Sequence, residues 1–198
     1  TIQSWQGQRA NIATYTKSLL EREEAIVREH TDDEIIHPSL LGAQLAALLP
    51  KNSALIAENP TARHGLLPFG HQQMWQFIEG GGSLGWGVGA AIGAKIGVGE
   101  ERPVVLSIGD GSLTYSAAGF WTMARYNVPV LTIVSNNESY QVVRQNWARE
   151  APESRMVKEG KFPGLFLGGP SIDYAALARS QGVSGERVTH PSDLEAAL

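Results

Sequence analysis

Two short polar motifs carry residue types that could bind a metal ion and a phosphate group together. The first is Gly109-Asp110-Gly111-Ser112, and Asn136-Asn137 follows 24 residues later. A carboxylate and an amide oxygen are hard ligands that suit Mg²⁺, which keeps water or phosphate oxygens in its remaining positions. Glycines permit a tight turn close to a phosphate, and the Ser112 hydroxyl and the first N–H groups of a following helix could donate to one. The two motifs together therefore indicate a Mg²⁺–diphosphate site.

Each motif follows a short apolar run that we expect to form a buried strand, Pro103–Ile108 before the first and Pro129–Val134 before the second. Tyr115–Tyr126 lies between them, and its pattern predicts a helix with these inward side chains: Ala117, Phe120, Trp121 and Ala124. Strand, helix and strand at this spacing predict two parallel strands that are neighbours or nearly so. Both motifs would then lie at carboxyl ends of strands, where open α/β sheets bind ligands.

A plainer interpretation exists for each motif alone. Gly-Asp-Gly is a common turn sequence, and two asparagines can occupy a loop without binding anything. Both motifs at this spacing, each after an apolar strand, should arise by chance on the order of once in a thousand chains of ordinary composition. The combination therefore favours a functional site.

The spacing from Gly109-Asp110-Gly111 to Asn136-Asn137 resembles the cofactor motif of thiamine-diphosphate-dependent enzymes. Residues 37–198 are similar to the diphosphate-binding domain of the branch that contains benzoylformate decarboxylase, other 2-oxo acid decarboxylases and acetolactate synthase. The resemblance implies an α/β fold, a three-layer sandwich with a mainly parallel sheet and helices on both faces. It also implies thiamine diphosphate and Mg²⁺ as cofactors.

The resemblance assigns roles to particular residues. It implies that Mg²⁺ is bound by the side chains of Asp110 and Asn137 and by the backbone carbonyl of Ser139. It places a backbone group of Gly82 against the aminopyrimidine ring, and the side chain of Leu84 under the cofactor, where it enforces a V shape. The implied cofactor-binding set is Thr61, Gly82, Leu84, Gly109, Asp110, Gly111, Ser112, Asn137, Ser139 and Tyr140. Val142 and Val143 would line the substrate pocket.

Several of these residues have structural alternatives. Thr61 follows an expected strand over Ser53–Ala57 and could simply belong to a capped turn. Leu84 could be a core leucine, and Val142 and Val143 could make core contacts.

A second hypothesis is an NAD(P)-dependent oxidoreductase, because Gly80–Gly85 matches G-x-G-x-x-G. That signal is weak, since Gln72–Glu79 is not a convincing buried strand and no matching acidic residue follows a second strand. A third hypothesis is a non-catalytic binding domain that keeps the fold.

The run Gly70–Trp75 resembles an acetolactate synthase segment in composition, but its order differs and we interpret it as coincidence.

A stripe of glycines follows, at Gly85, Gly89, Gly93 and Gly97. Each glycine inside a helix costs roughly 1 kcal/mol relative to alanine. A close approach of another backbone is therefore expected along this stripe.

Composition describes a globular chain of 198 residues, 42% hydrophobic and 18% charged. The net charge of −4 gives no sign of a nucleic-acid surface, and no stretch predicts a membrane span. Cysteine is absent, which excludes disulfide and thiolate chemistry. Because cysteine is absent, the cytoplasm is the simplest expectation. The first residues carry no basic and no apolar leader region.

The chain divides into an expected linker helix within residues 1–36, over Gln8–His30, and the domain proper at 37–198. Further expected elements are a helix capped by Ser39, a helix from Ser171 to Ser180, a strand over Val183–Val188 and a last helix from Ser192. The resembled family has one more strand, so we expect that the domain is truncated at its C-terminus.

The activity implied by the resemblance is decarboxylation of a 2-oxo acid, giving an aldehyde, or an acyloin after attack on a second carbonyl. The glutamate that activates the cofactor belongs, in that family, to the first domain of a partner subunit, usually within a homodimer or homotetramer. No residue of this chain takes that role. The fragment alone is therefore predicted to be inactive.

Overall fold

The computed structural model describes residues 2–62, 75–77 and 82–198, with side chains from 11 onward outside the short 75–77 segment. The chain forms two compact units. One contains Thr1–Leu48, Ala62–Gly70 and Val188–Leu198, and the other contains Leu49–Thr61 and His71–Arg187.

The second unit is built on a parallel sheet of four strands in the order β2-β1-β3-β4. Their bounds are Ala54–Glu58 for β1, Trp75–Phe77 for β2, Val104–Gly109 for β3 and Leu131–Ser135 for β4. Because β3 and β4 are parallel neighbours, the predicted strand–helix–strand unit is confirmed. The predicted burial of the second strand is wrong, since β4 is only partly buried and Leu131 is 36% exposed. Strand β2 lies where no strand was expected.

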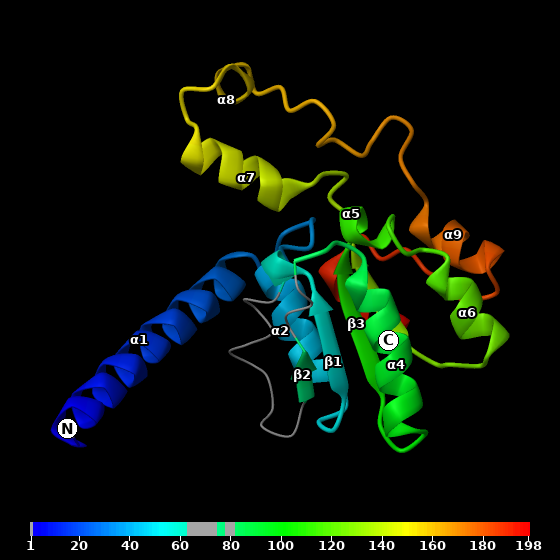
Figure 1. Cartoon of the computed structure of the whole chain (residues 1–198), viewed down its shortest axis with the longest axis horizontal. Coiled ribbons are helices and arrows are strands. Elements are labelled where there is room, and N and C mark those ends of the chain that lie inside the picture. The colour runs from blue at the N-terminus through cyan, green and yellow to red at the C-terminus, as the bar shows by residue number, and fades with distance from the viewer. Residues whose placement is uncertain (1, 63–74, 78–81) are drawn as a thin grey trace. The chain divides into compact units, whose positions relative to one another are not determined.

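Helices connect and cover these strands. Helix α4 packs along β1 and β3, and the single turn α5 directly follows β3 (Figure 1). The helices of this unit are α4 (Trp86–Val98), α5 (Asp110–Leu113), α6 (Gly119–Arg125), α7 (Gln141–Glu150), α8 (Arg155–Glu159) and α9 (Tyr174–Ser180).

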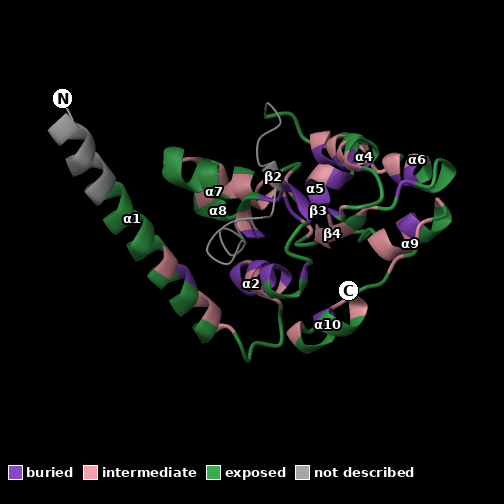
Figure 2. Cartoon of the chain, turned by 90° about the horizontal axis from the view of Figure 1, so that it is seen from below, coloured by how far each residue is buried: buried purple, intermediate pink, exposed green. Residues whose placement is uncertain are grey.

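The core of this unit lies between the sheet and α4, α5, α6 and α9. It consists of Ala54, Ile56, Val88, Ala91, Val104, Leu106, Ile108, Leu113, Phe120, Met123 and Ala178. All five residues of β1, and Val104–Ile108 of β3, are buried, so both faces of these strands are covered. The burial of β3 is visible in Figure 2. Continuous burial is what a parallel sheet inside an α/β fold requires, and the α/β prediction is confirmed.

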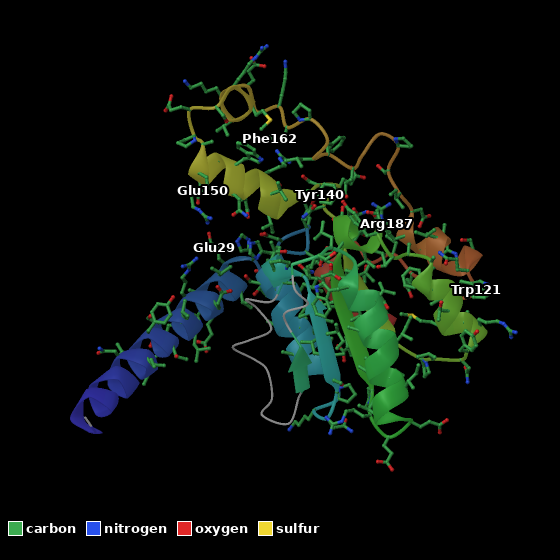
Figure 3. All side chains as sticks on the ribbon, viewed as in Figure 1. Glu29, Trp121, Tyr140, Glu150, Phe162 and Arg187 are labelled. Carbon is green, nitrogen blue, oxygen red and sulfur yellow. The ribbon has the colours of Figure 1, made fainter. Side chains whose placement is uncertain are left out.

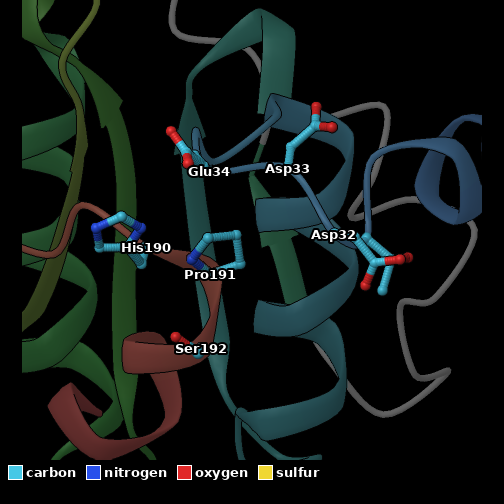
Figure 4. Close-up of a pocket in the computed structure, with 7 residues that line it drawn as sticks. Asp32, Asp33, Glu34, His190, Pro191 and Ser192 are labelled. Carbon is cyan, nitrogen blue, oxygen red and sulfur yellow. The ribbon is translucent and has the colours of Figure 1, made fainter.

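The first unit contains α1 (Ile2–Glu29), α2 (Pro38–Leu48), the short 3-10 helix η1 (Pro191–Asp193) and α10 (Leu194–Ala197). The Ser39 hydroxyl donates to the buried carboxylate of Glu23 at 3.1 Å, and the Gln44 amide donates to the Pro191 carbonyl at 3.1 Å. A cavity of about 300 Å³ in this unit is lined by residues 31–34 and 190–192 (Figure 4). In the described part of the chain, no helix has the length and apolar content needed to cross a bilayer.

The helix after β3 differs from the prediction in its start and its inward face. Residues Thr114–Ala118 form tight turns, with bonds such as Ser116 N–H to the Leu113 carbonyl at 3.0 Å. Regular α-helix therefore begins at Gly119. The tight turns before it rotate the chain by a different angle per residue than an α-helix starting at Tyr115 would, so the inward face differs from the predicted one. Phe120 is buried as predicted and Met123 is buried beside it, whereas Trp121 is 55% exposed and Ala124 is exposed, so the predicted inward position of these two residues is wrong.

Three other boundaries also differ. Helix α2 begins at Pro38, a favoured first position, so Ser39 is not the cap; its N–H instead donates to the His37 imidazole at 3.2 Å. Helix α9 is capped by Asp173, whose side chain accepts from the Ala176 N–H at 2.8 Å, and Ser171 lies outside it. The strand expected over Val183–Val188 is absent, because the Val183 N–H bonds back to the Ala178 carbonyl at the end of α9.

Candidate functional site

Strand register brings the two polar motifs to one edge of the sheet. In the parallel pair of β3 and β4, Gly109 lies opposite Ser135, the last residue of each strand. Asp110 and Asn136 are therefore the first residues beyond the two carboxyl ends. This is the position in α/β sheets where ligands bind.

Asp110 is a buried carboxylate that lacks a full set of partners. It is 2% exposed, and its Oδ2 atom is buried without a hydrogen-bond partner. Burial raises the pKa of the Asp110 carboxyl, and backbone N–H groups of Gly111, Glu138 and Ser139 oppose that shift. A buried carboxylate without a counter-charge is unfavourable, so this position suits a bound cation.

The loop after β4 places its amide side chains beside this carboxylate. Asn137 Oδ1 accepts from the Ser139 N–H at 3.0 Å, and Asn136 Oδ1 accepts from the Glu138 N–H at 3.1 Å. The Ser139 N–H also faces the Asp110 carboxylate. Asp110 and Asn137 therefore converge on one N–H group, which brings together two of the predicted metal ligands.

The third predicted ligand, the Ser139 carbonyl, is held by an antiparallel pairing with Phe166. The pairing is made by the flanking residues, with the Tyr140 N–H donating to the Leu165 carbonyl and the Leu167 N–H to the Glu138 carbonyl. In such a pair the central residues direct their own N–H and C=O groups away from each other. The Ser139 carbonyl is thus on the same side of its strand as the N–H that faces Asp110.

Two tyrosines pack around the Asp110 turn. The Tyr140 ring lies against Gly111, and the Tyr174 hydroxyl donates to the Asp110 carbonyl at 3.3 Å. Burial, followed by the charge of Asp110, raises the pKa of Tyr174 to about 12. Tyr174 is therefore a neutral hydrogen-bond donor at physiological pH.

Gly111→Ala is expected to destabilise the site. A Cβ at this position would lie 2.5 Å from a carbon of the Tyr140 ring, so the ring must move. Overpacking of this kind costs about 1–3 kcal/mol, which urea unfolding would measure.

The matched control is Gly89→Ala on α4, where a Cβ meets no atom within 4 Å. This variant should gain up to about 1 kcal/mol from helix propensity. Equal effects of the two substitutions would contradict the packing argument.

Residues after β1 also reach this edge of the sheet. The Asn59 side-chain NH₂ group donates to the Ser135 hydroxyl at 2.7 Å, and the Thr61 hydroxyl donates to the Asn59 side-chain Oδ1 at 2.9 Å. Thr61 is thus bonded within its own turn, which agrees with the alternative that it simply belongs to a capped turn. Asn59 links this turn to β4. The sequence pattern places the turn at a strand end and does not single out Asn59.

Glu58 was also missed, although it organises the next predicted part of the site. Its carboxylate accepts from the N–H groups of Gly85 and Gly87, each at 2.6 Å. These groups open α4, which has no side-chain cap of its own, and a negative charge is favoured there. Gly85 has φ 87°, a conformation that other residues rarely adopt.

Leu84 lies in the turn anchored by Glu58 and is 42% exposed, so the core interpretation of this leucine is wrong. Gly82 is exposed and has φ 78°. Gly80 and Gly81, like most of the Gly70–Trp75 run, lie outside the described residues. An exposed leucine before a helix remains available to a ligand, as its predicted role under the cofactor requires.

The remaining predicted residues lie at the starts of helices. Ser112 is within α5, and Val142 and Val143 are in the first turn of α7, beyond Tyr140 (Figure 3). No residue of α7 is buried, and Val143 is 40% exposed, so the core interpretation of the two valines is not supported. The close backbone approach expected along the glycine stripe is found at Gly85, where a Cβ would lie 3.3 Å from the Ser112 carbonyl oxygen, whereas a Cβ at Gly89, Gly93 or Gly97 would meet nothing within 4 Å.

The donor set fits Mg²⁺ better than a softer metal. Within the described ranges no three His, Cys, Asp or Glu side chains gather as a metal site. An ion at Asp110 would therefore have one carboxylate, one amide oxygen and one backbone carbonyl from this chain. Mg²⁺ commonly takes few protein ligands and completes its shell with phosphate and water.

Comparison with known proteins agrees with this geometry. The chain is 34% identical over 125 residues to benzoylformate decarboxylase of Pseudomonas aeruginosa, and 32% identical over 132 residues to acetolactate synthase isozyme 3 large subunit of Escherichia coli K12. These matches cover 62% and 66% of this chain and 21% of each relative. The solved benzoylformate decarboxylase of Polynucleobacter necessarius superposes with a TM-score of 0.69 at 28% identity, covering 82% of this chain and 30% of that one.

The family model described as thiamine pyrophosphate enzyme, C-terminal TPP binding domain, matches residues 59–198. The glycine run is therefore not the fingerprint of a nicotinamide-dependent oxidoreductase. By this match, the chain belongs to the thiamine pyrophosphate enzyme family and contains its C-terminal cofactor-binding domain.

Proposed function

We propose that this chain is the cofactor-binding part of an enzyme that uses thiamine diphosphate and Mg²⁺ to act on 2-oxo acids. The observation that carries the proposal is the buried Asp110 carboxylate, with one oxygen unbonded, beside the Asn137–Ser139 loop. The chain spans only 21% of the curated relatives quoted above, so the activity of the whole protein is inferred from them.

In this proposal Asp110, Asn137 and the Ser139 carbonyl bind the metal ion. Gly109, Gly111 and Ser112 lie close to the diphosphate, and Tyr140 and Thr61 complete its surroundings. Gly82 and Leu84 hold and bend the other end of the cofactor from a turn fixed by Glu58. Bound thiamine diphosphate supplies the electron sink for the electrons left when carbon dioxide departs.

The reaction class is decarboxylation, as in the benzoylformate decarboxylase relatives, or carbon–carbon bond formation, as in the acetolactate synthase relatives. Val142 and Val143 would present an apolar wall to the substrate. We further propose that the first domain of a partner subunit supplies the activating glutamate. The whole protein would then be a homodimer or homotetramer, and we expect it in the cytoplasm.

Titration of the chain with thiamine diphosphate, with and without Mg²⁺, tests the proposal. We expect weak binding that requires Mg²⁺ and no turnover of benzoylformate or pyruvate, because no residue here replaces the missing glutamate. Calorimetry would measure binding, and release of carbon dioxide would measure turnover. Binding that ignores Mg²⁺ would contradict the metal site, and robust turnover would contradict the predicted inactivity.

A non-catalytic domain that keeps this fold is the remaining alternative. It predicts that a full-length protein containing this chain, with substrate and both cofactors, releases no carbon dioxide and forms no acyloin. Release of carbon dioxide or formation of an acyloin by this full-length protein would contradict the alternative and support the proposed function.

A further inference from the structure

A short segment on the far side of the Ser139 loop holds that loop in place. The Leu165 carbonyl accepts from both the Tyr140 N–H and the Ser139 hydroxyl, each at 3.0 Å. The Leu167 N–H donates to the Glu138 carbonyl at 2.7 Å. Three hydrogen bonds thus join residues 138–140 to residues 165–167.

Arg144 connects this pairing to helix α7. Its Nη1 atom donates to the Ser139 Oγ atom at 3.2 Å, and its guanidinium carbon lies 5.1 Å from the centre of the Phe162 ring. The Ser139 hydroxyl therefore accepts from Arg144 while it donates to the Leu165 carbonyl. A hydroxyl that accepts from a cation is a stronger donor, so Arg144 reinforces the bond to Leu165.

The surroundings of Arg144 point to a structural task for its charge. Among the described residues, none of the carboxylates forms an ion pair with it. Its Nε atom is buried without a hydrogen-bond partner. It lines a cavity of about 160 Å³ together with Gly160, Phe162, Leu165 and Phe166. Its polar partner is thus a residue of the proposed metal site.

We propose that Arg144 is a positioning residue that fixes the Ser139 carbonyl for Mg²⁺ by locking the Ser139 side chain against the 162–167 segment. The proposal rests on the proposed function only for the identity of the metal ion. It assigns a task to a side chain that is not among the residues proposed to bind the metal ion or the cofactor. Loss of the guanidinium would loosen the loop and misplace one of three ligands.

Arg144→Ala should therefore weaken Mg²⁺ affinity at saturating thiamine diphosphate by about 10- to 100-fold, the usual effect of removing a group that orients a metal ligand. Calorimetry would give the dissociation constant. Hydrogen exchange of the Tyr140 and Leu167 amides, measured without any cofactor, should become faster. The matched control is Arg149→Ala, on the same helix, whose exposed side chain pairs with Glu150; it should change neither quantity by more than about two-fold.

Ser139→Ala separates positioning from a direct role. This variant removes the hydroxyl and keeps the carbonyl, so it should weaken Mg²⁺ binding to a degree similar to that of Arg144→Ala. If both substitutions act through the same contact, the double variant with Arg144→Ala and Ser139→Ala should bind Mg²⁺ as tightly as the weaker-binding single variant. Additive losses, or native Mg²⁺ affinity and native amide exchange in Arg144→Ala, would overturn the proposal.

Two other outcomes are distinguishable. In the full-length protein, a raised KM for a 2-oxo acid with unchanged Mg²⁺ affinity would show that Arg144 binds substrate carboxylate, which contradicts the positioning role. If the unmodified chain bound no cofactor, the proposed function would fail, and the amide exchange would still decide whether Arg144 locks the loop. Should Arg144→Ala not fold, Phe162→Leu, which removes the ring beneath the guanidinium, is expected to give the same faster exchange.

Discussion

Asp110→Asn should abolish Mg²⁺-dependent binding of thiamine diphosphate and leave the chain folded. The substitution keeps the size and the carbonyl oxygen of the side chain but removes the single carboxylate of the proposed metal site. Asn137 and the Ser139 carbonyl are neutral, so the remaining ligands provide no negative charge. Because a metal ion in the proposed site would join the diphosphate to the protein, we expect affinity to fall by about 100-fold or more, measured by calorimetry at fixed thiamine diphosphate.

The same substitution should have the opposite effect on stability when metal is absent. Burial raises the pKa of the Asp110 carboxyl, so the folded chain retains this proton at pH values at which the unfolded chain has lost it. The free energy of unfolding therefore decreases as the pH rises from the ordinary aspartate range through the raised pKa. Asp110→Asn removes that decrease, so in EDTA at pH 7 the variant should be at least as stable as the unmodified chain.

Asp173→Asn is the control for Asp110→Asn. Asp173 is exposed and caps α9, a position at which asparagine serves as well as aspartate. It should change neither cofactor affinity nor stability. If Asp110→Asn bound the cofactor normally, or lost stability in EDTA, the assignment of Asp110 as the metal-binding carboxylate would fail.

The sequence was sufficient to place the two motifs of the candidate site at strand ends, because that placement depends on local patterns. Apolar runs ending at Ile108 and Val134 predict buried parallel strands, and the residues directly after two parallel strands lie at one edge of the sheet. The structure adds the register, with Gly109 opposite Ser135, and the link from Asn137 through the Ser139 N–H to Asp110. The roles of Leu84 and Gly82 came only from the resemblance, because no periodicity marks a residue that is exposed to meet a ligand.

The features that the sequence missed depend on contacts between distant residues. The Glu58 carboxylate accepts hydrogen bonds from Gly85 and Gly87, which lie 27 and 29 residues further along the chain, and no sequence pattern predicts this pairing. The burial of Trp121 was predicted wrongly because a helical period was extended through tight turns. Local patterns thus locate strand ends, while the residues that fix the loops against each other need coordinates.

Glu58→Ala should be the most destabilising single substitution considered for this unit. Glu58 is 7% exposed, and its carboxylate accepts two hydrogen bonds of 2.6 Å. Its loss leaves the Gly87 N–H buried without that partner and removes the negative charge at the start of α4. Hydrogen bonds to a charged group contribute about 1.5–3 kcal/mol each, so we expect a loss of about 3–5 kcal/mol in urea unfolding. Glu100→Ala, an exposed glutamate just beyond α4, should change stability by less than about 0.5 kcal/mol.

Glu58→Gln separates the anchoring of the Leu84 turn from global stability. The glutamine oxygen can accept one of the two N–H groups, while its NH₂ group faces the other as a second donor and cannot bond to it. The variant should therefore fold and lose about half as much stability as Glu58→Ala. One hydrogen bond instead of two would then hold the turn from Gly82 to Gly85 and the start of α4. If this turn bends the cofactor, thiamine diphosphate affinity should fall several-fold at unchanged Mg²⁺ requirement, because Asp110 and Asn137 are untouched. A folded Glu58→Gln variant with native cofactor affinity would show that Glu58 supports the helix alone, and that Leu84 reaches the cofactor without help from β1.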